Sequence, residues 1–208
     1  MIKQIQEVPV TPESYPFAGA ARYVDLDTYG YEEREYYIRG SANVYESVGN
    51  TGGVAVKVPD APYVNRMIVR APKDPAQASG NIVVEIINPT SFMEIDRMWI
   101  LGYGKFLRDG DIYVGITSKP NTIAKLVEFD RERYSSLSWK NPTGDEAFPF
   151  TMEEIRARGI LPDLDIRYET GLFWDMLTDL AWLLRGDDAM NPLRGVEGRY
   201  VYLTGWSQ

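Results

Sequence analysis

The chain has 208 residues, 44% of them hydrophobic and 25% charged, which is the balance of an ordinary globular domain. Its 30 acidic and 22 basic residues give a net charge of −8, which disfavours binding to nucleic-acid phosphates or to anionic lipid. We therefore expect no nucleic-acid partner.

Two residue types are missing from the sequence. The absence of cysteine excludes disulfides, thiolate metal sites and cysteine nucleophiles among these residues. The absence of histidine removes the base that most often activates a serine nucleophile. No apolar run is long enough to span a membrane, and residues 1–10 lack the apolar core of a signal peptide. The compartment is unknown: we expect a soluble protein, cytoplasmic as given, or secreted if a leader has been removed.

The N-terminal part predicts an arm followed by strands. Residues 1–30 are rich in proline, glycine and aromatic side chains, which indicates an extended arm packed on the surface. Residues 35–45 are aromatic and β-branched but interrupted by Gly40, so they predict a strand with a bulge or a hairpin. G-N-T-G-G at 49–53 precedes the strand pattern V-A-V-K-V, whereas a phosphate-binding loop would precede a helix. This segment therefore favours a hairpin turn.

Two further strands are expected next. Residues 65–70, N-R-M-I-V-R, predict one strand and are followed by a polar loop. Residues 82–87, I-V-V-E-I-I, form a nearly continuous apolar run, typical of a central strand covered on both faces. Glu85 lies inside this run, where an unpaired carboxylate is costly. We expect Glu85 to have a structural partner rather than a catalytic role.

The next segment predicts a helix and another strand. Residues 95–108 show helical spacing, and Gly110 follows as a C-terminal stop. The apolar residues expected on one side of this helix are Trp99, Tyr103, Phe106 and Leu107. Residues 112–117, I-Y-V-G-I-T, predict a buried strand, which completes a right-handed parallel crossover with the strand before the helix.

Residues 118–168 form a long insertion. It contains a helical candidate at 121–128 and a capping box, Thr151 and Glu154, which opens a helix that ends near Gly159. An insertion at the carboxyl end of a sheet strand is a common place for a lid or a wall of a substrate pocket. A packed surface decoration fits the sequence equally well.

The strongest helix prediction covers residues 169–185, with Gly186 as its stop. Its wide apolar face consists of Leu172, Phe173, Met176, Leu177, Leu180, Ala181 and Leu184. The chain then loops through Asn191 and Pro192 into a β-branched and aromatic run at 200–204, typical of a strand buried in a parallel sheet.

This last strand leads directly into Gly205, Trp206, Ser207 and Gln208, which match the first four positions of the G-x-S-x-G nucleophile elbow. In such an elbow, a sharp turn between a strand and a helix exposes the serine hydroxyl at the carboxyl edge of the sheet. An ordinary turn after a strand also fits the tetrapeptide, so the rest of the chain has to decide.

The order of the elements predicts an α/β fold with a mostly parallel central sheet flanked by helices and with Ser207 on its central strand. We interpret residues 1–208 as a single incomplete α/β-hydrolase domain, the N-terminal half of that fold. In α/β hydrolases, the acid and the histidine of the catalytic triad follow the serine along the chain. Both are expected beyond residue 208, in the C-terminal half of the same protein or in a second chain.

Several segments are distinctive when taken together: E-Y-Y-I-R-G-S-A-N-V-Y, I-V-V-E-I-I-N-P-T-S, Y-V-G-I-T followed by F-D-R-E-R-Y-S-S-L-S, and L-T-G-W-S-Q. This combination, from about Tyr31 onward, resembles the bacterial proteins known as alpha/beta hydrolase domain proteins. The resemblance implies a serine hydrolase of the esterase type, with Ser207 as the nucleophile. The chain departs from that family in lacking the segment that carries the acid and the histidine.

The expected reaction is acyl transfer from a small-molecule ester to Ser207, followed by hydrolysis of the acyl-enzyme. The oxyanion requires two backbone N–H donors, and we expect one from Gln208, next to the nucleophile. The other should come from the loop after residue 87, where Thr90 and Ser91 are candidates and Thr90 is favoured. Trp206 and Asn88 are expected to line the substrate pocket.

Other groups of charged residues give weaker evidence for a metal or catalytic site. Three acidic pairs in polar loops are expected to be solvated turns, so we expect no metal and no cofactor: Asp25/Asp27, Asp163/Asp165 and Asp187/Asp188. A Ser–Lys dyad is conceivable with Lys105, Lys119 or Lys125, and their spacing favours none of them.

The main alternative is a catalytically inactive α/β-hydrolase-like binding or structural module. We also expect residues 1–208 alone to be inactive and poorly stable, because the strand before Ser207 would be an exposed edge.

Overall fold

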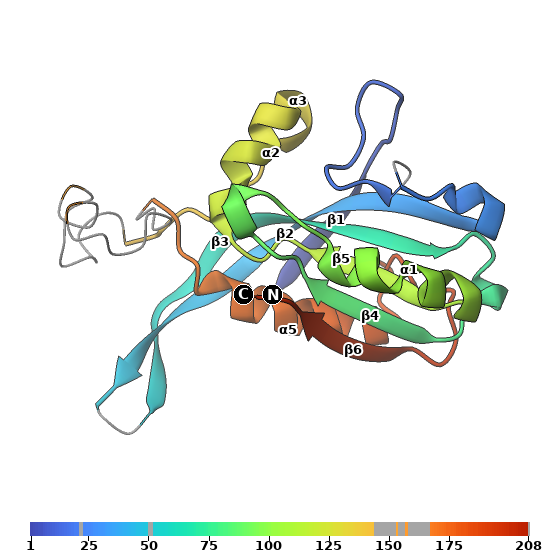
Figure 1. Ribbon diagram of the computed structural model, residues 1–208. Helices are drawn as coiled ribbons and strands as arrows, with labels where there is room; N and C mark the ends of the chain where they lie inside the picture. The colour runs from blue at the N-terminus through green and yellow to red at the C-terminus, as the bar shows by residue number, and fades with distance from the viewer. Residues whose placement is uncertain (21–22, 50–51, 144–152, 154–156, 158–166, 208) are drawn as a thin grey trace.

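The computed structural model describes residues 1–20, 23–49, 52–143, 153, 157 and 167–207, and their core is a six-stranded sheet (Figure 1). The spatial order of the strands is β1-β2-β3-β5-β4-β6. Their bounds are Ile2–Val8 (β1), Tyr31–Val48 (β2), Gly53–Pro72 (β3), Asn81–Ile86 (β4), Ile112–Ile116 (β5) and Tyr200–Gly205 (β6). Helices accompany this sheet, so the expected α/β class is confirmed.

The sheet is mixed, which corrects the expectation of a mostly parallel one. β1–β2, β2–β3 and β3–β5 pair antiparallel, whereas β4 pairs parallel with both β5 and β6. The difference follows from the connections. A short turn brings Val48 opposite Gly53 and so forces β2 and β3 to run in opposite directions, while a helix connects β4 to β5 and permits a parallel pair.

The β2–β3 hairpin is longer than the sequence pattern suggested. The two strands expected at 54–58 and 65–70 are parts of one strand, β3. The register with β2 shifts between Ala42 and Tyr45, which confirms a bulge shortly after Gly40. The expected hairpin near residues 49–53 is also confirmed, and the paired ends of β2 and β3 extend away from the body of the protein (Figure 1).

Helices cover both faces of the sheet. α-Helices occupy, among other residues, Arg97–Asp109 (α1), Ile123–Phe129 (α2), Arg131–Tyr134 (α3) and Leu172–Arg185 (α5). Short 3-10 helices occur at Leu26–Tyr29 (η2), Pro75–Gln77 (η3), Thr90–Phe92 (η4) and Pro120–Thr122 (η5). Figure 1 shows α1 on one side of β4 and β5 and α5 on the other.

The alternation of side chains along β4 and β5 produces two hydrophobic clusters. Ile82, Val84 and Val114 belong to the larger cluster, together with the apolar face of α5. Tyr113 points to the opposite face and packs with the α1 residues Trp99, Phe106 and Leu107. Tyr103, expected on the same side of α1, is instead 40% exposed.

The N-terminal segment contributes more than a surface arm. Residues Ile2–Val8 form β1, which pairs antiparallel with β2 and makes one edge of the sheet. Ala20, Val24 and Leu26 are buried in the cluster beneath α1. Much of the stretch expected to lie on the surface is therefore part of the core.

The beginning of the insertion packs against the sheet. Side chains of α2 and α3, including Leu126 and Tyr134, are buried in the larger cluster, as is Trp139. Ser138 forms an isolated bridge with Val64 of β3. The expected capping box at 151 and 154 lies outside the described residues. Among the residues that are described, no helix is both long and apolar enough to cross a bilayer.

β6 is an edge strand in the described part of the sheet, as expected for residues 1–208 alone, whereas the central position was expected for the complete fold. It pairs with β4 on one side, and the side chains of Tyr200, Tyr202 and Leu203 are all more than half exposed. A run of β-branched and aromatic residues identifies a strand but does not show how many neighbours the strand has.

Candidate active site

The candidate site lies where β4 and β6 end together. The two strands are parallel, with Ile86 opposite Gly205, so the residues that follow them emerge at the same edge of the sheet. On one side this places Ile87 and Asn88, and on the other side Trp206 and Ser207. The carboxyl ends of neighbouring parallel strands are a common location for active sites in α/β proteins.

Ser207 has the backbone of a strained turn. Its φ is +52°, a value that residues with a side chain seldom adopt. The residue is exposed, and it follows β6 immediately after Gly205 and Trp206. Strained backbone of this kind clusters at catalytic and ligand-binding positions, where the surrounding structure stabilises it.

Asn88 connects the two sides of the site. Its Nδ2 donates hydrogen bonds to the backbone carbonyls of Trp206 and Ser207, both at 2.8 Å. Its Oδ1 accepts a hydrogen bond from the N–H of Thr90 at 3.1 Å. The side chain is inside the protein, since only 1% of Asn88 is exposed. Asn88 therefore holds backbone, and the expectation that it lines a substrate pocket is not supported by its position.

The loop after β4, residues 88–95, is short and strained. Asn88 and Ile95 close it by two backbone hydrogen bonds, of 3.2 and 2.9 Å. Between them, Ser91 and Phe92 have positive φ values of 58° and 60°. We call residues 88–95 the β4 loop. Its backbone is held in one conformation directly beside the turn that carries Ser207.

The two oxyanion candidates in this loop differ in what their N–H groups do. The N–H of Thr90 already donates to Asn88 Oδ1. Ser91 follows in the left-handed region and belongs to η4. This engagement of the Thr90 N–H makes Ser91 the better candidate of the two. Gln208, the expected first donor, lies outside the described residues.

A second hydrogen-bonded contact anchors the start of the β4 loop to β5. The Ser118 hydroxyl donates to the carbonyl of Ile87 at 2.6 Å, and the N–H of Ile87 donates to Ile116 at 3.1 Å. Ser118 and Ile87 are both buried. The peptide before Asn88 is thus fixed on the side away from β6.

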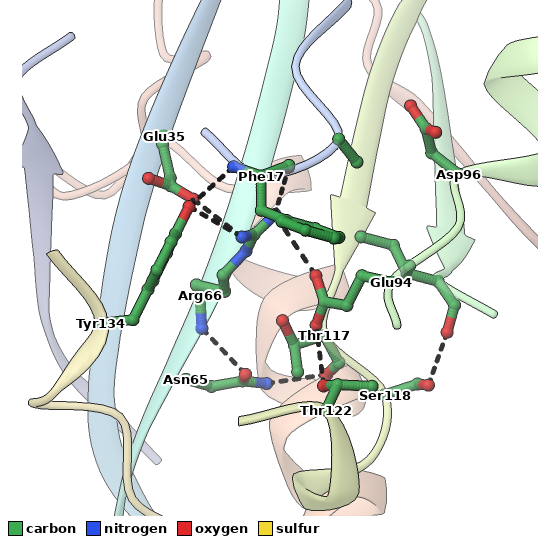
Figure 2. A network of polar contacts seen from close by, with 12 residues as sticks. Phe17, Glu35, Asn65, Arg66, Glu94, Asp96, Thr117, Ser118, Thr122 and Tyr134 are labelled. Atoms are coloured by element: carbon green, nitrogen blue, oxygen red, sulfur yellow. Dashed lines mark hydrogen bonds and ion pairs between the residues drawn. The ribbon is translucent and has the colours of Figure 1, made fainter. Parts of the chain in front are cut away.

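A buried ion network supports the other end of the β4 loop (Figure 2). The Glu94 carboxylate lies 3.3 Å from the Arg66 guanidinium and accepts a hydrogen bond from Thr122 at 3.2 Å. Arg66 is fully buried and also contacts Glu35, at 3.2 Å, and the Tyr134 hydroxyl, at 3.0 Å. The network joins β2, β3, the β4 loop and α3 through charged groups that are out of contact with water.

A second buried arginine, Arg70, lies farther along β3. It donates to Glu33 at 2.7 Å and to Asp96 at 2.6 Å, and its guanidinium stacks 4.4 Å from the Trp99 ring. The pKa of Asp96 is raised, with burial as the largest cause, although the charge and hydrogen bond of Arg70 lower it. Asp96 follows directly after the β4 loop, so this ion pair fixes the start of α1.

Glu85 has the structural role expected from the sequence. Its carboxylate accepts hydrogen bonds from the N–H groups of Met98 and Trp99 and from the Tyr113 hydroxyl, which is 2.7 Å away. Two of these donors belong to the first turn of α1, where helix N–H groups lack partners within the helix. Glu85 thus caps α1 from the neighbouring strand, and burial raises its pKa despite the three hydrogen bonds.

Trp206 is 53% exposed, so its indole is accessible beside Ser207. A cavity of about 780 Å³ lies elsewhere, at a surface formed by the N-terminal segment and α3, and its lining does not include Ser207, Trp206 or Asn88.

The amines of two of the lysines considered for a dyad are engaged by carboxylates. Lys105 pairs with Asp111, and Lys125 pairs with Glu128.

Sequence reasoning missed the residues that support the site. The clamp formed by Asn88 depends on carbonyls 118 and 119 residues farther along the chain, and no local pattern reveals that pairing. Arg66 and Glu94 were also not singled out. The one available signal for Arg66 was a charged residue within an apolar strand, the same signal that drew attention to Glu85.

A family model described as "Alpha/beta hydrolase domain" matches residues 5–208. No curated protein and no solved structure matches the chain. The matched range covers nearly all of the sequence, including β4, β6 and the β4 loop.

Proposed function

Because the chain belongs to the alpha/beta hydrolase domain family, we propose that it is a serine hydrolase that cleaves small-molecule carboxylic esters, with Ser207 as the nucleophile. The observation that carries the proposal is the backbone of Ser207. Ser207 has a φ of +52°, is exposed, and lies two residues after Gly205 at the end of a strand, and these features support the nucleophile elbow that we propose.

In this mechanism the Ser207 Oγ attacks the ester carbonyl, and the alcohol leaves as an acyl-enzyme forms. Water then attacks the acyl-enzyme and releases the acid. Negative charge develops on the carbonyl oxygen in both steps, so two backbone N–H donors must already point towards that oxygen. We assign these to Gln208 and to the β4 loop, where Ser91 is preferred to Thr90.

Residues 1–208 contain no histidine, the side chain that most often serves as the base for a serine nucleophile. We propose that the imidazole and its acidic partner come from a further segment of the same protein or from a second chain. β6 offers a place for such a segment, since its exposed edge and apolar side chains are suited to pairing with another strand.

The experiment is hydrolysis of p-nitrophenyl esters by the full-length natural protein and by its Ser207→Ala variant. We expect Ser207→Ala to lower kcat by about 10⁴-fold or more, with binding of the ester little changed. Ser47→Ala, at an exposed position in the β2–β3 hairpin, is the matched control and should retain the activity. Equal activity of wild type and Ser207→Ala would refute Ser207 as the nucleophile.

The alternative is a catalytically inactive member of the same fold that acts as a binding or structural module. That alternative predicts no turnover by the wild-type protein with esters of any acyl length, despite a complete fold. A protein that hydrolyses esters through Ser207 excludes it.

A further inference from the structure

We infer that Asn88 is a positioning residue, which fixes the distance between the nucleophile turn and the oxyanion donors of the β4 loop. The inference rests on the proposed function and adds to it a residue that the chemistry itself does not require. Asn88 has a side chain that contacts both backbone segments at once, through Nδ2 on one side and Oδ1 on the other.

Asn88 makes a pair of hydrogen bonds to the nucleophile turn. A carboxamide nitrogen has two N–H groups, and here both are used, one for each of two successive carbonyls. Two bonds to adjacent peptides restrain both the position and the orientation of the turn. This is the backbone that carries the positive φ of Ser207, and such strain persists only where neighbouring groups hold it.

Asn88 also makes a hydrogen bond to the β4 loop. Oδ1 of Asn88 accepts from the N–H of Thr90, and Ser91 is the next residue. The main chain of Asn88 is itself fixed by two hydrogen bonds to Ile95. The carboxamide is therefore a short rigid connection between the turn of Ser207 and the backbone N–H groups proposed to bind the oxyanion.

The distance between the turn of Ser207 and the β4 loop affects the rate of the reaction. Attack by Ser207 and stabilisation of the oxyanion require the nucleophile and the donors to be placed within about 0.5 Å of the productive geometry. A displacement of about 1 Å is enough to lower the rate roughly 100-fold. Loss of the Asn88 clamp should therefore slow the chemical step without removing any group that contacts the substrate.

The chain provides a matched control in Asn191. Its Nδ2 donates to the carbonyls of Leu184 and Gly186, at 3.1 and 2.7 Å, and its Oδ1 accepts from the N–H of Leu193 at 2.9 Å. Asn191 is 4% exposed, and it precedes β6, at the strand end opposite Ser207. A substitution there removes the same three kinds of hydrogen bond but leaves the site intact.

The test compares Asn88→Ala with Asn191→Ala in the full-length protein. The measured quantities are kcat and KM for a p-nitrophenyl ester, the rate of phosphonylation by a fluorophosphonate probe, and the melting temperature. For Asn88→Ala we expect kcat and the phosphonylation rate to fall about 10- to 100-fold, with KM within about threefold of wild type. For Asn191→Ala we expect a comparable loss of melting temperature and wild-type kinetics.

Asn88→Ser provides a second variant if Asn88→Ala does not fold. A serine hydroxyl has one O–H donor and lies one bond nearer the backbone than Nδ2, so it cannot hold both carbonyls. The kcat of Asn88→Ser should therefore be lower than that of Asn191→Ser. Wild-type kinetics in a folded Asn88 variant would overturn the inference while leaving the proposed function intact. A wild-type protein that neither hydrolyses esters nor reacts with the probe would instead refute the proposed function, and this inference with it.

Discussion

Several buried charges in this protein have structural partners that the chain supplies from a distance. Glu85 is the clearest example, because a carboxylate in the middle of a strand caps a helix that begins a dozen residues later. Its neighbour Tyr113 donates to the same carboxylate from the adjacent strand β5. The three donors offset part of the cost of burying the charge, and the pKa of Glu85 is still raised, with burial as the largest cause.

Glu85→Gln tests this balance through the pH dependence of stability. Since the pKa of folded Glu85 is raised above 4.5, the folded state holds this proton more tightly than the unfolded state does. Wild type should therefore lose stability as the pH rises from about 4.5 through the raised pKa, in excess of any loss in Glu85→Gln. Urea unfolding of both proteins from about pH 4 to pH 8 measures the difference. Parallel stability curves over this range would show that Glu85 does not titrate as described.

Arg66 allows a second test at the level of single residues. Replacing this fully buried guanidinium by methionine leaves Glu94 without a cationic partner, so Arg66→Met should destabilise the protein by about 3–5 kcal/mol. Adding Glu94→Gln should recover part of that loss, because the uncompensated charge is then removed. Lys125→Met, at an exposed ion pair, should change stability by less than about 1 kcal/mol. Equal effects of Arg66→Met and Lys125→Met in denaturant unfolding would contradict the network.

Helix α1 shows how elements are delimited by particular residues. Glu85 caps its first turn, and Gly110 ends it with a left-handed φ of +76°. A Cβ at Gly110 would lie 2.4 Å from the carbonyl oxygen of Gln77, so only glycine fits there. Gly104, in the same helix, is exposed and has no atom within 4 Å of the place of a Cβ.

These two glycines should respond to alanine in opposite directions. Gly104→Ala should stabilise the protein by about 0.5–1 kcal/mol, because alanine favours the helix interior. Gly110→Ala should destabilise it by more than about 1 kcal/mol, because it combines an unfavourable φ with a steric clash. Thermal or urea unfolding of the two variants measures both changes. A stabilising Gly110→Ala would show that the helix ends in another way.

Elements were more predictable from the sequence than their arrangement. The apolar face of α5 and the strands around 82–87 and 112–117 follow from local spacing, which the side-chain pattern carries directly. The position of β6 at the edge does not follow from its composition, which an edge strand and a central strand can share; it was expected from the order of the elements in residues 1–208. Residues 2–8 were assigned to an arm for a related reason: their partner, β2, is distant in sequence.

At the scale of the whole molecule, the site is where separate parts of the chain converge. Ser207 follows β6, Asn88 and the loop to Ile95 follow β4, and Ser118 follows β5. The sequence indicated Ser207 through the G-x-S spacing and predicted one of the two oxyanion donors in the loop after residue 87. It could not indicate that Asn88 joins the two, because that contact depends on the parallel register of β4 with β6.

The account depends on Ser207 being an activated nucleophile in the intact protein, and covalent labelling tests this most directly. The full-length natural protein is treated with a fluorophosphonate, digested, and examined by tandem mass spectrometry for the modified peptide. We expect one phosphonyl group on Ser207, absent from Ser207→Ala and formed at the wild-type rate in Ser47→Ala. A folded protein that remains unlabelled, or that carries the label on a different residue, would contradict the account.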